Sequence, residues 1–337
     1  MAAWGAHHSQ EVPVHAVVRG GGSIGARHVE VLRSLGLSVD LWPVRPRPEA
    51  DGVVGDDGGP AACATADLVV VATDTGRHVA DALVALDAGA ARVLVEKPLS
   101  PAAVDADPLS RHDRADRVRV AAPLRGHRAY ALVLGLVRAA ARPLSAHVAC
   151  QSWLPDWRPG RDYRESYSAR ADEGGVLRDL VHELDYATAL LGPPDLSWAA
   201  LDRSGPLQMP AEQAATLAWT TPDEDRVLAR LDYVSRPGRR HLSLDGPDLR
   251  LDWDLLSHTV VHVSADGRRH EHAFADDADR NVVMARQAAA VLGDRSAEED
   301  PAAPPTLPEA LETMRLCDRA RGADHRSTPT RPDRRTS

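Results

Sequence analysis

The stretch VHAVVRGGGSIGARHVEVLRSLG, residues 14–36, decides the fold class of this chain. Its first five residues include three valines, a composition typical of a short buried strand. Gly20, Gly22 and Gly25 follow in G-x-G-x-x-G spacing, and apolar side chains then recur at near-helical spacing until Gly36. The pattern predicts a strand, a tight turn and a helix in direct succession.

The same alternation continues through the first 122 residues. Strands that alternate with helices at this spacing favour a parallel, doubly wound sheet, so the predicted class of this part is α/β. In such sheets the loops at the carboxyl ends of the strands bind the ligand. The further elements predicted here are strands at 37–42, 67–73, 92–97 and 117–122, and a helix at 78–89.

The pattern changes after Pro123. Period-two alternation from 197 to 275 predicts a large, mainly antiparallel sheet with one face turned to water or to a partner. Thr306 and Glu309 have the spacing of a capping box at the start of the last helix. The helices predicted in this part are 128–141, 176–191, 279–292 and 307–320, and an aromatic and arginine-rich loop is predicted at 153–170.

These patterns divide the chain into three parts. Residues 1–122 are predicted to form the doubly wound domain, and residues 123–322 an α+β domain with an open sheet. Residues 323–337 are too polar to bury apolar area and are predicted to be disordered.

Composition excludes several classes of function. A net charge of −9 without a basic tract argues against nucleic-acid binding. No apolar run reaches the roughly 18 residues that a membrane helix needs, and the first residues lack the pattern of a secretion signal. We therefore expect a cytoplasmic protein with a small-molecule partner. Cys63, Cys150 and Cys317 are widely spaced and without a CxxC motif, which favours reduced thiols and no metal site.

The glycine loop suits a dinucleotide. Gly20 permits the tight turn, Gly22 lets the backbone approach a pyrophosphate, and Gly25 allows close packing of helix on strand. The anion would rest on free N–H groups at the start of the helix, which places Ser23 and Ile24 in the site. A plain tight turn, or a site for S-adenosylmethionine, remains open on the glycines alone.

The end of the second predicted strand bears on the choice between NAD and NADP. An NAD site usually has an acidic residue there to bind the ribose hydroxyls, but this chain has WPVRPRP. Arg45 and Arg47 could bind a 2'-phosphate, whereas Asp40 lies too early in the strand. We expect NADP or NAD, with NADP favoured; a solvated Arg-Pro loop is the alternative.

Lys97 is the only lysine among the 40 lysine and arginine residues of the chain. It closes the fourth predicted strand, at the edge where a doubly wound sheet opens its cleft, and Pro98 stiffens the chain beyond it. An ammonium there could donate hydrogen bonds to a substrate oxygen and stabilise a developing alkoxide.

A second set of polar residues lies in the predicted helix 176–191. At 100° per residue Asp179, His182 and Tyr186 share one face, whereas Asp185 lies off it and is expected to serve structure. His182 has the pKa range of a general acid or base, and Asp179 could orient its ring. The alternative is a surface helix with an ordinary Asp–His pair.

Together these motifs resemble the Gfo/Idh/MocA oxidoreductases. The resemblance covers nearly the whole chain and depends most on EKP after the fourth strand and on GG(x)3D(x)2HExxD, and it disfavours the methyltransferase alternative. It implies a Rossmann domain, a second domain whose open sheet forms a dimer face, and a nicotinamide cofactor. It also implies Lys97, Asp179 and His182 as the catalytic group, and a cofactor cleft that includes Thr73, Asp74, His78, Glu96 and Pro98.

The chain departs from the family pattern at several positions. Arg19 replaces an apolar residue of the first strand, and the step from Asp179 to His182 is one residue shorter than in many members. Arg125 is a candidate substrate contact in a changed motif, LRGH. The other candidate substrate contacts lie in the loop before the helix and are Arg161, Tyr163, Arg164 and Tyr167.

The sequence thus predicts an NAD(P)-dependent dehydrogenase or reductase for a secondary alcohol or ketone of a sugar, cyclitol or nucleotide sugar. It also predicts a homo-oligomer, either a dimer or a tetramer. A non-catalytic dinucleotide or sugar sensor on the same scaffold is the rival, and the joint presence of Lys97 and His182 argues against it.

Overall fold

The computed structural model of the chain describes residues 14–45, 52–55 and 57–323, and two sheets organise them. The first sheet is parallel, with strand order β2-β1-β3-β4-β5, which confirms the predicted doubly wound class. Its strands are β1 (His15–Arg19), β2 (Ser38–Trp42), β3 (Leu68–Val71), β4 (Val93–Val95) and β5 (Val118–Val120). The helices that follow them are α1 (Ser23–Ser34), α2 (Gly59–Ala64), α3 (His78–Ala88) and α4 (Asp107–Ser110).

Three of these strands end earlier than predicted. Thr73 after β3 and Glu96 after β4 lie outside the ladder, as does Ala122 after β5. Val71 and Val95 are completely buried and Val120 is nearly so, because both faces of a doubly wound sheet are covered by helices. After β3 and β4 the chain thus leaves the sheet close to the first polar side chains, Thr73 and Glu96, at the carboxyl edge.

The second sheet has eight strands in the order β13-β12-β11-β10-β6-β9-β8-β7. All neighbours are antiparallel except β6 and β9, which confirms the mainly antiparallel prediction. Its strands are β6 (Ser145–Trp153), β7 (Asp195–Asp202), β8 (Ala214–Thr220), β9 (Arg226–Asp232), β10 (Val234–Asp245), β11 (Leu249–Asp254), β12 (Thr259–Ser264) and β13 (Arg269–Ala273).

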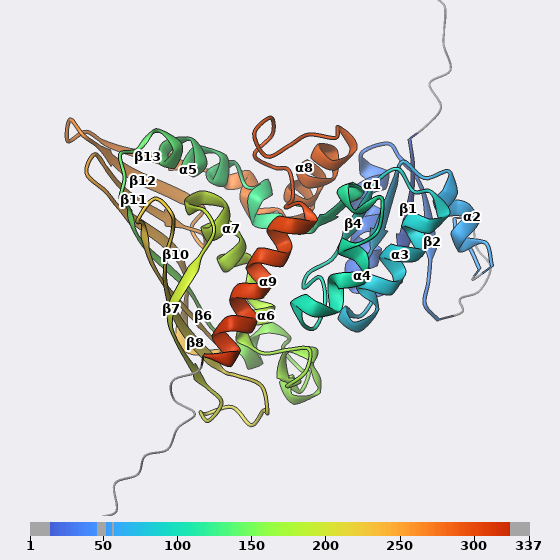
Figure 1. Ribbon diagram of the computed structural model, residues 1–337, viewed down its shortest axis with the longest axis horizontal. Helices are drawn as coiled ribbons and strands as arrows, with labels where there is room; N and C mark the ends of the chain where they lie inside the picture. The colour runs from blue at the N-terminus through green and yellow to red at the C-terminus, as the bar shows by residue number, and fades with distance from the viewer. Residues whose placement is uncertain (1–13, 46–51, 56, 324–337) are drawn as a thin grey trace, which may run out of the picture.

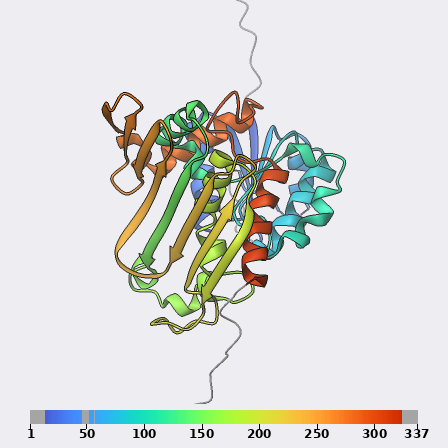
Figure 2. The same ribbon diagram turned by 60° about the vertical axis from the view of Figure 1, so that its left-hand side comes forward.

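Helices cover one face of this sheet. Figure 1 shows α5 (Arg128–Ala139) and α7 (Val181–Leu191) on the side that faces the first sheet, with the short α6 (Val176–Asp179) below them. Trp219 and Trp253 point into this layer and are almost fully buried. Burial of each such side chain contributes about 1.5–3 kcal/mol. The outer face, which comes forward in Figure 2, carries no helix of the described chain.

The last two helices join the two sheets. Val291 of α8 (Arg280–Leu292) packs against the strands of the first sheet, and α8 also contacts α1. Leu311 of α9 (Leu307–Gly322) packs into the first domain, whereas Leu316, one turn later, packs into the second. The predicted boundary near residue 122 therefore separates the two sheets, but the first domain needs helices from the end of the chain.

The structure also bears on the predictions made for the helix cap, the C-terminal tail and the cysteines. The capping box at Thr306 is confirmed, since its hydroxyl accepts from the N–H of Glu309 and the Glu309 carboxylate accepts from Thr306. The tail predicted to be disordered lies, from residue 324 on, outside the described residues. None of the helices in the described part of the chain has the length and apolar composition needed to span a bilayer. The three cysteines are free and buried.

Candidate active site

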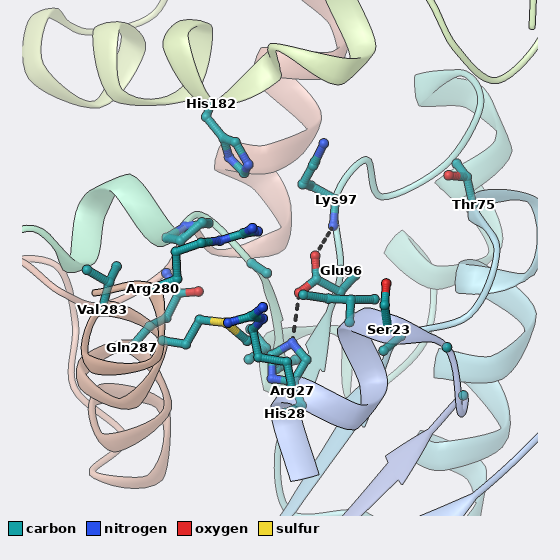
Figure 3. A pocket seen from close by; sticks show the side chains of 18 of the residues that line it. Ser23, Arg27, His28, Thr75, Glu96, Lys97, His182, Arg280, Val283 and Gln287 are labelled. Atoms are coloured by element: carbon teal, nitrogen blue, oxygen red, sulfur yellow. Dashed lines mark hydrogen bonds and ion pairs between the residues drawn. The ribbon is translucent and has the colours of Figure 1, made fainter. Parts of the chain in front are cut away.

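A cleft of about 1140 Å³ opens between the carboxyl edge of the first sheet and the helix-covered side of the second. Lys97, from the end of β4, and His182, from α7, point into it from opposite sides (Figure 3). The structure therefore brings together two residues that are 85 positions apart in the sequence. The other predicted residues that line the cleft are Gly20, Gly22, Ser23, Ile24, Arg45, Thr73, Asp74, His78, Glu96 and Tyr167.

The glycine loop forms the floor of this cleft at the start of α1. Gly20 has a φ of +110°, and a Cβ there would collide with the carbonyl of Ala72. Gly25 does not line the cleft; a Cβ there would meet the carbonyl of Gly20, so it serves helix packing. Gly22 has no atom within 4 Å of its Cβ position, which leaves its backbone open to a ligand. The loop is thus shaped for close approach of a phosphate to a helix N-terminus.

Arg19 is accommodated by the structure without loss of packing. Its guanidinium is 4.0 Å from the ring centroid of Trp42, donates to the carbonyl of Pro43 at 2.9 Å, and pairs with Asp81 at 3.2 Å. A buried charge is tolerated when it is paired and hydrogen-bonded. This arginine therefore ties β1 to α3 beside the glycine loop.

The segment after β4 is fixed by two histidines. His28 of α1 lies 2.7 Å from the carboxylate of Glu96. Burial raises the pKa of Glu96, but the hydrogen bond and charge of His28 and the nearby Lys97 outweigh this and hold it below its usual range. His78 lies between the carbonyls of Pro98 and Thr73, at 2.8 and 3.0 Å. Pro98 thus supports the cleft through its carbonyl and does not line it.

Lys97 is held by a buried hydrogen-bond network. Its Nζ lies 3.1 Å from both the carboxylate and the backbone carbonyl of Asp179, and 3.4 Å from the hydroxyl of Tyr167. Burial lowers the pKa of Lys97, but the Asp179 carboxylate more than offsets this and raises it overall. The amine is therefore an ammonium at neutral pH, and its three N–H groups face three acceptors, of which Tyr167 at 3.4 Å is the most distant.

Asp179 orients Lys97, which corrects the expectation that it holds the ring of His182. Its carboxylate accepts hydrogen bonds from Tyr167, from Ser168 at 2.6 Å and from Tyr233 at 3.0 Å, besides the ammonium. Burial raises its pKa, but these donors and Lys97 hold it below the usual range. The carboxylate is thus engaged by four donors, and His182 is not among them.

The helix predicted at 176–191 is broken at Leu180, and Lys97 explains the break. The carbonyl of Asp179 would accept the N–H of Glu183 in a continuous helix, but it accepts from Lys97 instead. The Glu183 N–H bonds to the carbonyl of Leu180, and α7 starts again from there. Asp179 and His182 therefore lie on different helices and do not share the predicted face. Tyr186, the third predicted member of that face, is fully buried in the core.

His182 is half-buried in the cleft and close to several cations. Burial, followed by the charges of Lys97, Arg240 and Arg280, holds its pKa well below the usual value. At neutral pH the imidazole is uncharged, which is the form that accepts a proton from a hydroxyl group.

Several predicted substrate contacts lie elsewhere. Arg125 is 2% exposed, and its guanidinium forms a bidentate pair with Asp185 at 2.8 and 2.9 Å, outside the cleft. Arg164 is exposed and pairs with Asp162. Tyr163 accepts from the N–H of Gln208 through its hydroxyl, and Arg161 is exposed on the same loop. None of these four lines the cleft, and Arg47 lies outside the described residues.

The lining residues that sequence reasoning missed include His28, His127, Arg240 and Arg280. His28 follows the glycine loop in α1, so its position was readable from the motif. The other three belong to the second domain, and only the docking of that domain brings them to the cleft.

Replacement of Arg125 by methionine is expected to lower the free energy of unfolding by about 3–5 kcal/mol, because Asp185 would remain as a buried unpaired carboxylate. KM per folded enzyme should stay near the wild-type value, since the side chain lies outside the cleft. Urea unfolding and steady-state kinetics check this, with Arg111→Met as control. Arg111 forms only an exposed pair with Asp107, worth ~0.5 kcal/mol or less. A large rise in KM for Arg125→Met at wild-type stability would contradict the assignment.

Comparison with known proteins gives structural matches only. No family model and no curated protein matches the sequence. UDP-N-acetylglucosamine 3-dehydrogenase GnnA from Acidithiobacillus ferrooxidans superposes with a TM-score of 0.70 at 19% identity, covering 93% of this chain and 98% of that one. An oxidoreductase from Agrobacterium radiobacter, in complex with NAD+, L-tartaric acid and magnesium, gives 0.76 at 16% identity over 94% and 98%.

WlbA dehydrogenase from Bordetella pertussis, in complex with NADH and UDP-GlcNAcA, gives a TM-score of 0.68 at 18% identity, covering 94% of this chain and 98% of that one. In each case the match extends over both sheets, because nearly the whole of each chain is covered. The chain therefore has the two-domain fold of the Gfo/Idh/MocA oxidoreductases, the family that its motifs resemble.

Proposed function

We propose that the chain is a nicotinamide-dependent oxidoreductase that interconverts a secondary alcohol and a ketone on a sugar, cyclitol or nucleotide sugar. One observation carries the proposal: an ammonium and an uncharged imidazole from different domains face the same cleft as a dinucleotide-type glycine loop. The structural neighbours support both parts of the proposal. They include a nucleotide-sugar dehydrogenase, which supports the substrate class, and complexes with NAD+ or NADH, which support the cofactor.

The residues of the cleft fit a dinucleotide. Gly22 leaves room for a pyrophosphate above the start of α1, and the buried hydroxyl of Thr73 has no hydrogen-bond partner in the described chain. A bound nicotinamide would supply the hydride acceptor or donor. Every proton and hydrogen-bonding step belongs to side chains of this protein.

In the oxidative direction the two residues have distinct tasks. Lys97 turns the N–H that faces Tyr167 at 3.4 Å to the substrate oxygen, and its charge stabilises the negative charge that develops on that oxygen. His182 accepts the hydroxyl proton as the carbon loses hydride. In reduction the imidazolium returns that proton to the carbonyl oxygen. Asp179 holds the ammonium through its carboxylate and its carbonyl, and Tyr167 donates to that carboxylate, so both are positioning residues.

The experiment is a binding and turnover series. The protein is titrated with NADPH and then NADH by nicotinamide fluorescence, and a panel of sugars, cyclitols and nucleotide sugars is then assayed by absorbance of reduced nicotinamide. Turnover of at least one class supports the proposal. Tight cofactor binding without turnover of any compound would favour the sensor instead.

The cofactor preference gives a separate prediction. Arg45 lines the cleft just after the end of β2, whereas Asp40 does not line it and lies 3.1 Å from His15. We propose that NADP binds more tightly than NAD. Arg45→Ala is expected to lower the NADPH-to-NADH affinity ratio about tenfold, the usual effect of losing one charge-assisted hydrogen bond. Parallel fluorescence titrations check this, with exposed Arg111→Ala as control, and an unchanged ratio in Arg45→Ala would contradict it.

A further inference from the structure

The side chains that line the cleft carry a positive net charge, although the chain as a whole is negatively charged. The chain has 49 acidic and 40 basic side chains, but seven Lys or Arg and four Asp or Glu line the cleft. Part of this excess lies beside the glycine loop, where an anionic cofactor would neutralise it. Three of the seven, Lys97, Arg240 and Arg280, lie close enough to His182 to act on its pKa.

Most charges near His182 have partners within the protein. Lys97 is neutralised by Asp179, and Arg240 pairs through its Nε with the completely buried Glu183. The Asp277 carboxylate is also engaged: Arg286 lies 2.7 Å away, and two backbone N–H groups at the start of α5 donate to it at 3.0 Å. Within this group each positive charge is therefore balanced by one carboxylate.

Arg280, the first residue of α8, is the exception. Its guanidinium has no ion pair and no hydrogen bond with any residue that the structure describes. Arg240 also retains terminal nitrogens without a partner in the described chain, because only its Nε contacts Glu183. Figure 3 shows Arg280 beside His182 and across the cleft from Lys97. The walls next to His182 thus hold one unbalanced positive charge and several free guanidinium donors.

We infer that the substrate carries an anionic group, a carboxylate or a phosphate, next to the carbon that is oxidised or reduced, and that Arg280 together with Arg240 binds it. The inference rests on the proposed function. Guanidinium groups match both anions because their planar donors form paired, charge-assisted hydrogen bonds. An anion bound there would remove the charge that the protein leaves uncompensated.

Such an anion would also change the pKa of His182, the proposed general base. The cationic groups that face His182 are Lys97 from the end of β4, Arg240 from β10 and Arg280 from α8, and all three disfavour the imidazolium; the titratable His127, from the turn before α5, also disfavours it when protonated. A bound carboxylate or phosphate reverses part of this effect. With an anionic substrate, the fall of kcat at low pH should therefore begin at a higher pH than the fall of kcat/KM, because kcat reports the complex and kcat/KM the free enzyme.

The test compares acidic compounds with their neutral counterparts. Binding to the enzyme–NADPH complex is measured for D-glucuronate against D-glucose, UDP-glucuronate against UDP-glucose, and glucose 6-phosphate against glucose. We expect at least one acid to bind about tenfold to a hundredfold more tightly than its counterpart. The pairs distinguish a carboxylate from a phosphate. If no acid binds more tightly than its neutral partner, the inference is overturned.

Two variants test whether Arg280 is responsible for the tighter binding of acids. Arg280→Gln is expected to lower the acid-to-neutral ratio of binding at least tenfold. Arg164→Gln is the matched control, because Arg164 is also exposed to solvent but pairs with Asp162 outside the cleft, and its ratio should remain at the wild-type value. Thermal unfolding of both variants shows whether they fold. A ratio that is unchanged in Arg280→Gln, or lost equally in Arg164→Gln, contradicts the assignment.

The outcomes separate the two levels of the proposal. If a neutral sugar is turned over as well as its acid, the oxidoreductase function stands and the anion site fails. If acids bind selectively but no compound is turned over with either cofactor, the anion site stands and the oxidoreductase function fails.

Discussion

Lys97→Arg is expected to lower kcat about a hundredfold to a thousandfold while the fold and the affinity for NADPH are retained. This is the loss that follows removal of one preorganised donor to a developing oxyanion. The substitution keeps the positive charge opposite Asp179, so the buried carboxylate is not left unpaired. A guanidinium is planar and longer than an ammonium, and it cannot reach the Asp179 carbonyl, its carboxylate and a substrate oxygen in the same geometry.

The structural readouts of this variant separate a catalytic role from a purely structural one. Circular dichroism and a fluorescence titration with NADPH should give wild-type results, and steady-state kinetics should show the loss mainly in kcat. Arg125→Lys is a useful comparison, because it changes a buried basic side chain that lies outside the cleft. Turnover at the wild-type rate in Lys97→Arg would refute the assigned role.

The first domain could be predicted from the sequence because its signals are local. Three glycines in fixed spacing, an apolar run before them and a helix after them specify one turn, and the structure has it at the predicted residues. Lys97 could also be placed, since the carboxyl end of a parallel strand fixes the direction of the chain. The period-two pattern of the sequence also predicted β9, a strand of the second sheet, and its residues do alternate between exposed and buried over most of its length.

What could not be predicted depends on contacts between distant residues. The periodicity over 176–191 is helical throughout, yet the helix breaks because Lys97 takes the carbonyl of Asp179. Arg125 follows a strand of the first domain and looked accessible, but Asp185 from α7 buries it. Arg280 carries no local signal, because it reaches the cleft only through the docking of α8 on the first sheet.

His182→Gln is expected to lower kcat/KM for alcohol oxidation about a hundredfold to ten-thousandfold, the range associated with loss of a general base. Glutamine keeps a polar side chain of similar size in the cleft but cannot accept the hydroxyl proton at neutral pH. Binding of NADPH should be unaffected, because the glycine loop and the end of β3 lie across the cleft from α7. Steady-state kinetics with the best substrate of the panel provide the measurement.

The role of His182 as a base also predicts how kcat/KM for alcohol oxidation depends on pH. Oxidation requires the uncharged imidazole, and burial together with Lys97, Arg240 and Arg280 depresses the pKa of His182. The wild-type kcat/KM should therefore stay high down to a pH below about 6.5, the unperturbed histidine value, and fall only as His182 becomes protonated. In His182→Gln that fall should vanish, whereas Lys97→Arg should retain it, because its base is intact. An unchanged acid limb in His182→Gln would assign the proton to another group, and one candidate in the cleft would then be His127, whose pKa is lowered by burial to about 4.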